Sequence, residues 1–162
     1  MKSIPLIILL LTLSLNAQNQ NDSVMISLQR TLCYGECPAY SVTIWGDGKV
    51  EFNGREFVNT IGLKTYTISR NSVDSLVREI FAIDFFSFND SYITQRTLSH
   101  LPDGRVDTVI TQVTDLPTQY VTVKIGTQKK TVEDYYGTPK AIRELENKID
   151  SVAKTSQWVK RK

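Results

Sequence analysis

Apolar and polar residues alternate one by one in several short stretches of the chain. This period of two is typical of strands that bury one face. Such stretches lie at residues 24–30, 40–44, 50–52, 65–68, 121–125 and 129–133, with a further β-branched stretch at 106–113. Gly46-Asp47-Gly48 between the second and third stretches predicts a tight hairpin turn, and Asn53-Gly54 predicts another turn soon after.

The spacing of apolar residues changes to that of an amphipathic helix after Ile68. Four positions follow the i, i+3, i+4, i+7 rule: Val73, Leu76, Val77 and Ile80. Ser69 or Asn71 is suited to cap the start of this helix, and we expect its end near Ile83. Three phenylalanines that follow are expected to anchor the helix exit in the core, because aromatic side chains bury large areas: Phe85, Phe86 and Phe88.

A second helix is expected to open at Thr138-Pro139, with Thr138 as the cap and Pro139 at the first helical position. Its apolar stripe consists of Ile142, Leu145, Ile149 and Val152. Glu144 and Lys148 have the spacing of an exposed ion pair. Trp158 lies just past this helix, and we expect it to fold back on the core.

These elements predict an α+β fold. Half-buried strands need a cover, so we expect a mainly antiparallel sheet of about five to seven strands with two amphipathic helices packed on one face. The domain would span residues 24–158, with a short basic tail at 159–162. The polar segment 89–119 is either an irregular loop or an extra hairpin with Pro102-Asp103-Gly104 at its tip.

The N-terminus has the layout of a secretory signal peptide. Lys2 is followed by an apolar run from Ile4 to Leu15, and cleavage is expected after Ala17. The run is too short to span a bilayer comfortably. We therefore predict an exported protein, periplasmic or secreted, that begins with a polar linker at residues 18–23 and has no stable membrane anchor after cleavage.

The charge balance narrows the range of partners. The chain has 19 basic and 17 acidic residues, and one of the basic residues, Lys2, belongs to the signal peptide. Near-neutrality argues against nucleic acid, which calls for a strongly basic face. A polybasic membrane patch is excluded as well, apart from the short end at 160–162. The expected partner is an unidentified envelope protein or ligand.

Cys33 and Cys37 are the only cysteines. Paired cysteines usually oxidise in an exported protein, so we interpret them as a structural disulfide across a short loop. The alternatives are a redox-active pair, a zinc site, and free or intermolecular thiols. The spacing differs from the C-x-x-C of thioredoxin-like proteins, and a structural zinc site needs four ligands.

Catalytic motifs are scarce in this chain. His100 is its single histidine, and it lies in the polar segment beside Leu101. The sequence has no nucleophile elbow, phosphate-binding loop, dinucleotide fingerprint or zinc-protease helix. Gly46-Asp47-Gly48 lacks the neighbouring carboxylates of a calcium loop. We therefore assign no catalytic residue, no metal ligand and no cofactor.

Acidic and aromatic residues in the loops form a possible recognition surface. Its members are Asp90, Tyr92, Asp115, Asp134 and Tyr135. If they meet at one edge of the sheet, three of the carboxylates (Asp90, Asp115 and Asp134) can form a cation site or an acid pair. The alternative is that these aspartates only cap turns.

Several strings together resemble the family known as domain of unknown function 6438. They lie at residues 26–38, 40–44, 46–50, 115–118 and 130–137, with Pro139 after them. The cysteine loop and the stretch 133–139 are the most specific parts, and the resemblance covers about residues 24–153. Residues 89–113 are longer than the family leads us to expect. The resemblance implies one fold unit in an exported bacterial protein, and it implies no activity.

The sequence favours a non-enzymatic binding or interaction module of the cell envelope that uses loops at one end of the sheet. One alternative is a carboxylate-based envelope hydrolase acting on wall or glycan material, which would need two carboxylates across an open cleft. Another is a structural envelope component or an inhibitor, which would present an exposed apolar patch.

Overall fold

The computed structural model describes residues 23–159, so the predicted signal peptide and the residues 160–162 of the predicted tail lie outside the described part. Seven strands form one sheet in the order β4-β3-β2-β1-β8-β9-β5. Their bounds are β1 Met25–Arg30, β2 Ala39–Trp45, β3 Lys49–Glu56, β4 Gly62–Thr67, β5 Ser91–Tyr92, β8 Gln119–Ile125 and β9 Gln128–Asp134. All neighbours are antiparallel except β5, which runs parallel to β9.

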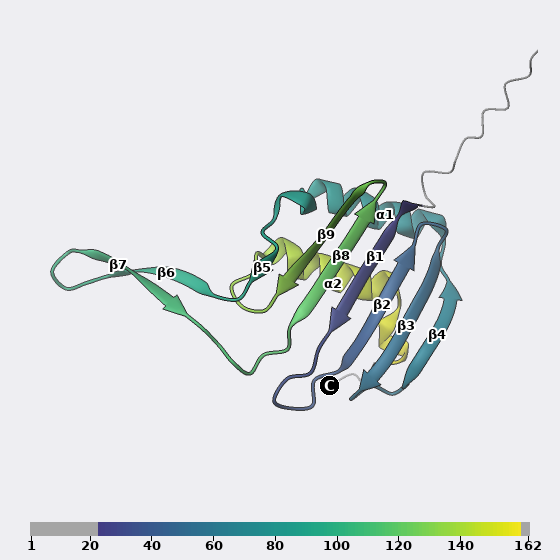
Figure 1. Ribbon diagram of the computed structural model, residues 1–162, viewed down its shortest axis with the longest axis horizontal. Coiled ribbons are helices and arrows are strands. Elements are labelled where there is room, and N and C mark those ends of the chain that lie inside the picture. Colours follow the sequence, from purple (N-terminus) through teal and green to yellow (C-terminus); the bar gives the residue numbers. More distant parts are fainter. Residues whose placement is uncertain (1–22, 160–162) are drawn as a thin grey trace, which may run out of the picture.

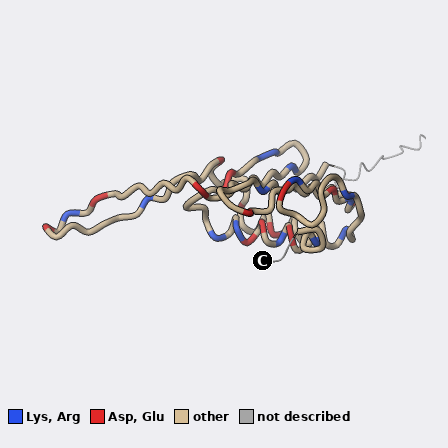
Figure 2. The backbone as a smooth tube through the Cα atoms, turned by 90° about the horizontal axis from the view of Figure 1, so that it is seen from below, with Lys and Arg blue, Asp and Glu red and all other residues tan. Residues whose placement is uncertain are grey.

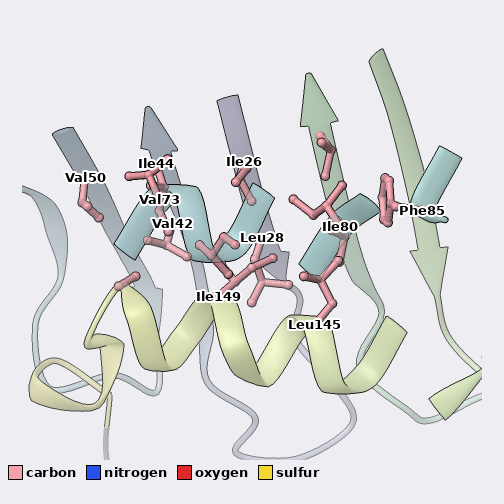
Figure 3. Close-up of a cluster of buried hydrophobic side chains, with 14 of the residues drawn as sticks. Ile26, Leu28, Val42, Ile44, Val50, Val73, Ile80, Phe85, Leu145 and Ile149 are labelled. Carbon is pink, nitrogen blue, oxygen red and sulfur yellow. The ribbon is translucent and has the colours of Figure 1, made fainter. Parts of the chain in front are cut away.

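Two helices, α1 Arg70–Ala82 and α2 Lys140–Val152, cover one face of this sheet (Figure 1). The structure therefore confirms the α+β fold with a mainly antiparallel sheet and both helices on one side. Alternation along the strands decides which side chains face the helices. Ile26 and Leu28 of β1, for example, are fully buried, whereas their neighbours Met25 and Ser27 are not. Figure 3 shows these side chains meeting those of α1 and α2 in one continuous core.

Helix α1 begins as its sequence predicts. The Ser69 side chain caps it by accepting a hydrogen bond from the Ser72 N–H at 3.2 Å. Val73, Leu76 and Ile80 form its buried stripe. The short 3-10 turn η2, Phe85–Ser87, follows, and Phe85 is fully buried, which confirms the expected core anchor.

The N-cap residue of helix α2 and the partner of its Glu144 ion pair both differ from the prediction. Its N-cap is Pro139, and Thr138 is not the cap, because the Thr138 hydroxyl donates instead to the buried carboxylate of Asp134. Glu144 forms its ion pair with Lys140, at 2.7 Å, in place of the predicted Lys148. Lys140 lies one turn before Glu144 and Lys148 one turn after it, so both satisfy the same spacing rule and the sequence did not distinguish them.

The predicted turn at Asn53-Gly54 is wrong, because both residues lie inside β3 and pair with β2. Glycine is needed at position 54 for another reason. A Cβ atom there would collide with the carbonyl oxygen of Thr60, where the chain passes close to the strand.

The segment 89–119 contains an extra hairpin, one of the two predicted alternatives. Strands β6 Gln95–His100 and β7 Val106–Thr111 form a separate two-stranded sheet. We call residues 95–111 the arm. It stands away from the body of sheet and helices in two perpendicular views (Figures 1 and 2).

The C-terminal end of the described chain folds back on the core. After α2 and the short turn η3, Thr155–Gln157, the Trp158 ring stacks on Phe52 with centroids 4.8 Å apart and meets Tyr66 edge-on at 5.0 Å. This confirms the predicted return of Trp158. Within residues 23–159, none of the helices is long and apolar enough to cross a membrane.

Candidate functional site

The helix-facing side of the sheet ends in polar side chains where β1 stops and β2 starts. Arg30 follows Ile26 and Leu28 at alternate positions of β1, so it continues the buried face. Tyr40 lies directly opposite Arg30 on β2. Both side chains therefore extend under α2, whose last turn supplies Asp150.

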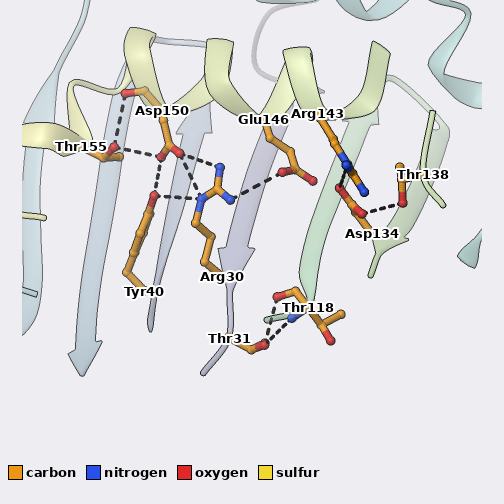
Figure 4. Close-up of polar contacts among 10 residues, drawn as sticks. All are labelled: Arg30, Thr31, Tyr40, Thr118, Asp134, Thr138, Arg143, Glu146, Asp150 and Thr155. Atoms are coloured by element: carbon orange, nitrogen blue, oxygen red, sulfur yellow. Dashed lines mark hydrogen bonds and ion pairs between the residues drawn. The ribbon is translucent and has the colours of Figure 1, made fainter. Parts of the chain in front are cut away.

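Arg30, Tyr40, Asp150 and Thr155 form one hydrogen-bonded network (Figure 4). Arg30 donates to Asp150 Oδ2 from Nε at 3.1 Å and from Nη2 at 2.9 Å, and its Nε also donates to Tyr40 Oη at 3.0 Å. The hydroxyls of Tyr40 and Thr155 donate to Asp150 Oδ1 at 2.8 and 2.9 Å. Three side chains thus satisfy a carboxylate that is mostly withdrawn from water.

The surroundings keep Arg30 charged and Tyr40 protonated. Burial by itself lowers the pKa of Arg30, but Asp150, Tyr40 and Glu146 outweigh that effect and raise the pKa overall. Burial, and then the charge of Asp150, raises the pKa of Tyr40 far above its ordinary value. The phenol therefore remains a donor to Asp150 at any physiological pH.

Glu146 projects from the middle of α2 into the same layer, with one carboxyl oxygen toward Arg30 and the other toward Asp134 (Figure 4). Arg30 Nη1 lies 3.5 Å from Glu146 Oε2, whereas the buried Oε1 has no hydrogen-bond partner when both carboxyls are ionised. Burial raises the pKa of Glu146 to about 8; Arg30 lowers it, and the charge and hydrogen bond of Asp134 raise it. Glu146 therefore holds its proton at neutral pH, and a protonated Oε1 can donate the hydrogen bond that the ionised form cannot.

Asp134, at the end of β9, is only 2% exposed. Its Oδ1 accepts from the Thr138 hydroxyl at 2.5 Å, and its Oδ2 lies 3.5 Å from Arg143 Nε. These two contacts compensate the burial of the carboxylate.

Loops meet beside this network. The N–H of Thr31 donates to the Thr118 carbonyl at 3.0 Å, and the N–H of Thr118 donates back to Thr31 Oγ1 at 2.9 Å. These bonds hold the loop 31–38 against the segment 112–118. A disulfide joins Cys33 and Cys37 across the first loop, with Cα atoms 5.6 Å apart.

Two adjoining hollows of about 340 and 270 Å³ open between these loops and α2, and they share Arg30, Pro117 and Gln119. We call them together the end groove. Its other lining residues are Leu116, Asp134, Tyr135, Arg143, Glu146 and Asn147 in the first hollow, and Cys37, Pro38, Tyr40 and Val159 in the second.

The end groove offers hydrogen-bond donors to a ligand. Arg30 Nη1 has only the long contact to Glu146, and the half-exposed Arg143 uses only Nε toward Asp134. A guanidinium group carries five N–H donors, so both arginines retain donors for further partners. The amides of Gln119 and Asn147 add to them. This lining suits a partner with acceptor oxygens, such as carbonyl or carboxylate groups.

A larger, more open hollow of about 860 Å³ lies along β8 and β9. Three of its four charged side chains already have polar partners. Lys130 Nζ lies 2.6 Å from Asp90 Oδ1, and Glu133 accepts from Ser91 at 2.8 Å and from Tyr120 at 3.4 Å. We therefore regard the smaller end groove as the better candidate site.

The residues predicted as a recognition surface lie on neighbouring segments at the β9–β5 edge of the sheet: Tyr92 pairs with Asp134, the N–H of Tyr135 donates to the Tyr92 carbonyl, and the N–H of Leu116, next to Asp115, donates to the Tyr135 hydroxyl. The surroundings of their side chains nevertheless differ. Asp134 and Tyr135 line the end groove, but Asp134 is buried there. Asp90 is exposed beside Lys130 in the larger hollow, Tyr92 packs against the core, and Asp115 is exposed in the segment before β8. Across residues 23–159, no three His, Cys, Asp or Glu side chains lie close enough to hold a metal ion.

The sequence reasoning missed the four residues that organise the site, although their positions carried a signal. Arg30 and Tyr40 fall in the apolar phase of their strands. Glu146 interrupts the apolar stripe of α2 between Leu145 and Ile149, and Asp150 follows Glu146 by one turn. Charged residues in buried phases on facing elements indicate a buried, paired network.

Comparison with known proteins identifies a family. A family model described as a domain of unknown function, DUF6438, matches residues 24–153. No curated protein matches the chain. The matched range includes both helices, the arm and the polar network beneath α2.

Proposed function

Because the chain belongs to the DUF6438 family, whose function is unknown, we propose its function from the site itself: a non-enzymatic, exported binding module of the cell envelope that holds its partner in the end groove. The observation that carries this proposal is the pair of arginines in the groove wall. Arg30 and Arg143 are held by buried carboxylates, yet both keep free N–H donors at the groove. Such donors are pre-positioned for a ligand, which lowers the entropy cost of binding.

Two features support export. The Cys33–Cys37 disulfide is compatible with an oxidising compartment, where such bonds persist. The N-terminal residues have the layout of a signal peptide.

The geometry of the carboxylates favours binding over hydrolysis. Glycoside hydrolysis usually places two carboxyl groups roughly 5–9.5 Å apart across the scissile bond. Glu146 and Asp134 are instead both buried, with exposed fractions of 4% and 2%. They therefore do not face each other across an open cleft.

Site-specific photo-crosslinking tests the proposal. A benzophenone amino acid at Leu116, which is 41% exposed at the groove rim, is expected to capture a partner in the envelope fraction. The same group at Phe81, which is 54% exposed on α1, serves as the control position.

Two substitutions on α2 make the test specific for the groove. Arg143→Ala removes a groove donor and is expected to abolish the Leu116 crosslink. Lys148→Ala removes an exposed cation from the same helix and is expected to leave the crosslink unchanged. A crosslink that is equally strong from Phe81, or that survives Arg143→Ala, would refute the groove as the binding site.

A further inference from the structure

Strand β7 presents an open edge whose only charged residue is Asp107. Among the described residues, β6 and β7 pair only with each other. A lone two-stranded ribbon is marginally stable in water, and natural edge strands are usually blunted by lysine, proline or a bulge. The sequence of β7, VDTVIT, has no lysine or proline, and its register with β6 is continuous.

The turn of the arm shows which backbone groups of β7 face outward. The N–H of Leu101 donates to the Arg105 carbonyl at 2.8 Å, so these two residues form a hydrogen-bonded pair. In an antiparallel ladder such pairs alternate with pairs that lack mutual bonds. The backbone groups of three β7 residues therefore point away from β6: Val106, Thr108 and Ile110.

The same three residues share one face of the arm with Leu98, which lies opposite Thr108 on β6. The large apolar members of this face are exposed: Leu98 at 73%, Val106 at 52% and Ile110 at 57%. Val106 and Ile110 thus combine outward backbone groups with exposed apolar side chains.

We propose that two copies of the chain pair through their β7 edges, antiparallel about a two-fold axis at Thr108. Val106 then lies opposite Ile110 of the partner subunit, and Thr108 lies opposite Thr108 of the partner subunit. All outward backbone groups of β7 gain hydrogen bonds, and the two ribbons become one four-stranded sheet. The exposed Leu98, Val106 and Ile110 side chains of both copies join on one face.

The side chains that face each other favour this pairing over its neighbours. The arm carries two arginines and two aspartates, Arg96, Arg105, Asp103 and Asp107, so the charges of these four residues balance and two arms have no excess of either sign to repel one another. With the axis at Thr108, Asp107 faces Val109 of the partner subunit. An axis at Asp107 would oppose two aspartates, and like charges directly opposite destabilise a sheet. Pairing of β6 edges about Leu98 would place Arg96 opposite His100 and would leave Leu98 as the only apolar residue with an apolar partner.

Sedimentation analysis of the full chain over a wide concentration range tests this pairing. Wild type is expected to reach twice the mass of one chain. Thr108→Lys places two lysines opposite each other and is expected to weaken the dimer by about a hundredfold. Thr97→Lys puts the same change on β6, away from the axis, and is expected to leave the dimer intact.

Cysteine trapping tests the position of the axis. Residues of a hydrogen-bonded antiparallel pair have Cα atoms about 5.5 Å apart, a distance that a disulfide can bridge. Thr108→Cys is expected to form a covalent dimer on oxidation, and Thr97→Cys is expected not to.

Four results would overturn the proposal. These are a wild-type chain that stays monomeric at every concentration, a dimer that persists in Thr108→Lys, equal trapping at both cysteine positions, or open-ended oligomers. The arm lies outside the end groove, so Arg143→Ala is expected to leave the dimer unchanged. Failure of the dimer and failure of the groove proposal are therefore separate results.

Discussion

Glu146 is the residue whose charge depends most on its surroundings. In an unfolded chain a glutamate releases its proton near pH ~4.3. In the fold, burial raises the pKa of Glu146 to about 8. The folded state thus binds this proton more tightly than the unfolded state. The stability that proton binding contributes is therefore fully present below the pKa of the unfolded chain, and it is lost as the pH rises through the pKa of the folded chain.

Glu146→Gln is expected to make the protein more stable at alkaline pH. The neutral amide can donate to Asp134 and accept from Arg30 without needing a proton. The unfolding free energy of the variant should exceed that of wild type by ~2 kcal/mol or more at pH 9, and the difference should shrink toward pH 5. Urea unfolding at several pH values measures this.

Glu144→Gln is the matched control for this pH dependence. Glu144 is exposed on the same helix, so its variant should follow the wild-type curve at every pH. If the unfolding free energy of Glu146→Gln instead varied with pH in parallel with that of wild type, the result would contradict the raised pKa of Glu146.

Asp150→Ala is expected to cost about 2–3 kcal/mol of unfolding free energy, because it leaves Arg30 and Tyr40 without their acceptor in a mostly buried layer. Thermal unfolding at neutral pH measures the loss. Lys148→Ala, an exposed change on the same helix, should have almost no effect. Equal stability of the two variants would show that water replaces Asp150 without cost.

At the scale of elements, two further contacts of different kinds add to the apolar stripe that holds α2 on the sheet. The polar network lies under its second half, and the aromatic stack of Trp158 on Phe52 follows it. The carbonyl oxygen of Trp158 also accepts from the N–H groups of Asn59 and Thr60, at 2.7 and 3.2 Å. The chain end therefore ties the loop after β3 to the helix.

Trp158→Ala is expected to lower the unfolding free energy by ~3 kcal/mol, since it empties the space against Phe52 and Tyr66. Hydrogen exchange at the amides of Asn59 and Thr60 should accelerate, because their acceptor loses its anchor. Gln157→Ala, exposed in the same turn, is the control and should change neither quantity. Unchanged exchange in Trp158→Ala would mean that the backbone alone holds this turn.

At the scale of the molecule, the structure consists of a two-layer body and a projecting arm. Basic and acidic residues are interspersed over the body (Figure 2), consistent with the near-neutral balance of the sequence. The end groove and the arm offer two separate surfaces, one for a partner and one for a second copy of the chain.

Export is expected to have two measurable consequences for the whole molecule. When it is produced with its native N-terminus in a bacterial host, the protein should appear in the envelope or medium without residues 1–17. Cys33 and Cys37 should resist alkylation until they are reduced. Intact-mass measurement after alkylation, with and without reductant, checks both the cleavage and the disulfide. A full-length cytosolic chain with two alkylated thiols would contradict the prediction.

The local pattern of the sequence was sufficient to predict most of the elements. Alternation predicted the strands, the Ser69 cap and the apolar stripes predicted the helices, and Pro102-Asp103-Gly104 predicted the tip of the arm. These features depend on residues close in the chain, which is why a one-dimensional reading was enough.

Contacts between distant residues were decided only by the tertiary structure. Thr138 donates a hydrogen bond to Asp134 instead of capping α2. Gly54 allows the close approach of the Thr60 carbonyl instead of forming a turn. Arg30 donates to Asp150, which lies 120 positions further along the chain. A residue's partner in a buried layer depends on which elements pack together, and the identity of one residue does not encode that. For the same reason the end groove, whose lining residues come from several separate segments of the chain, could be recognised only in the fold.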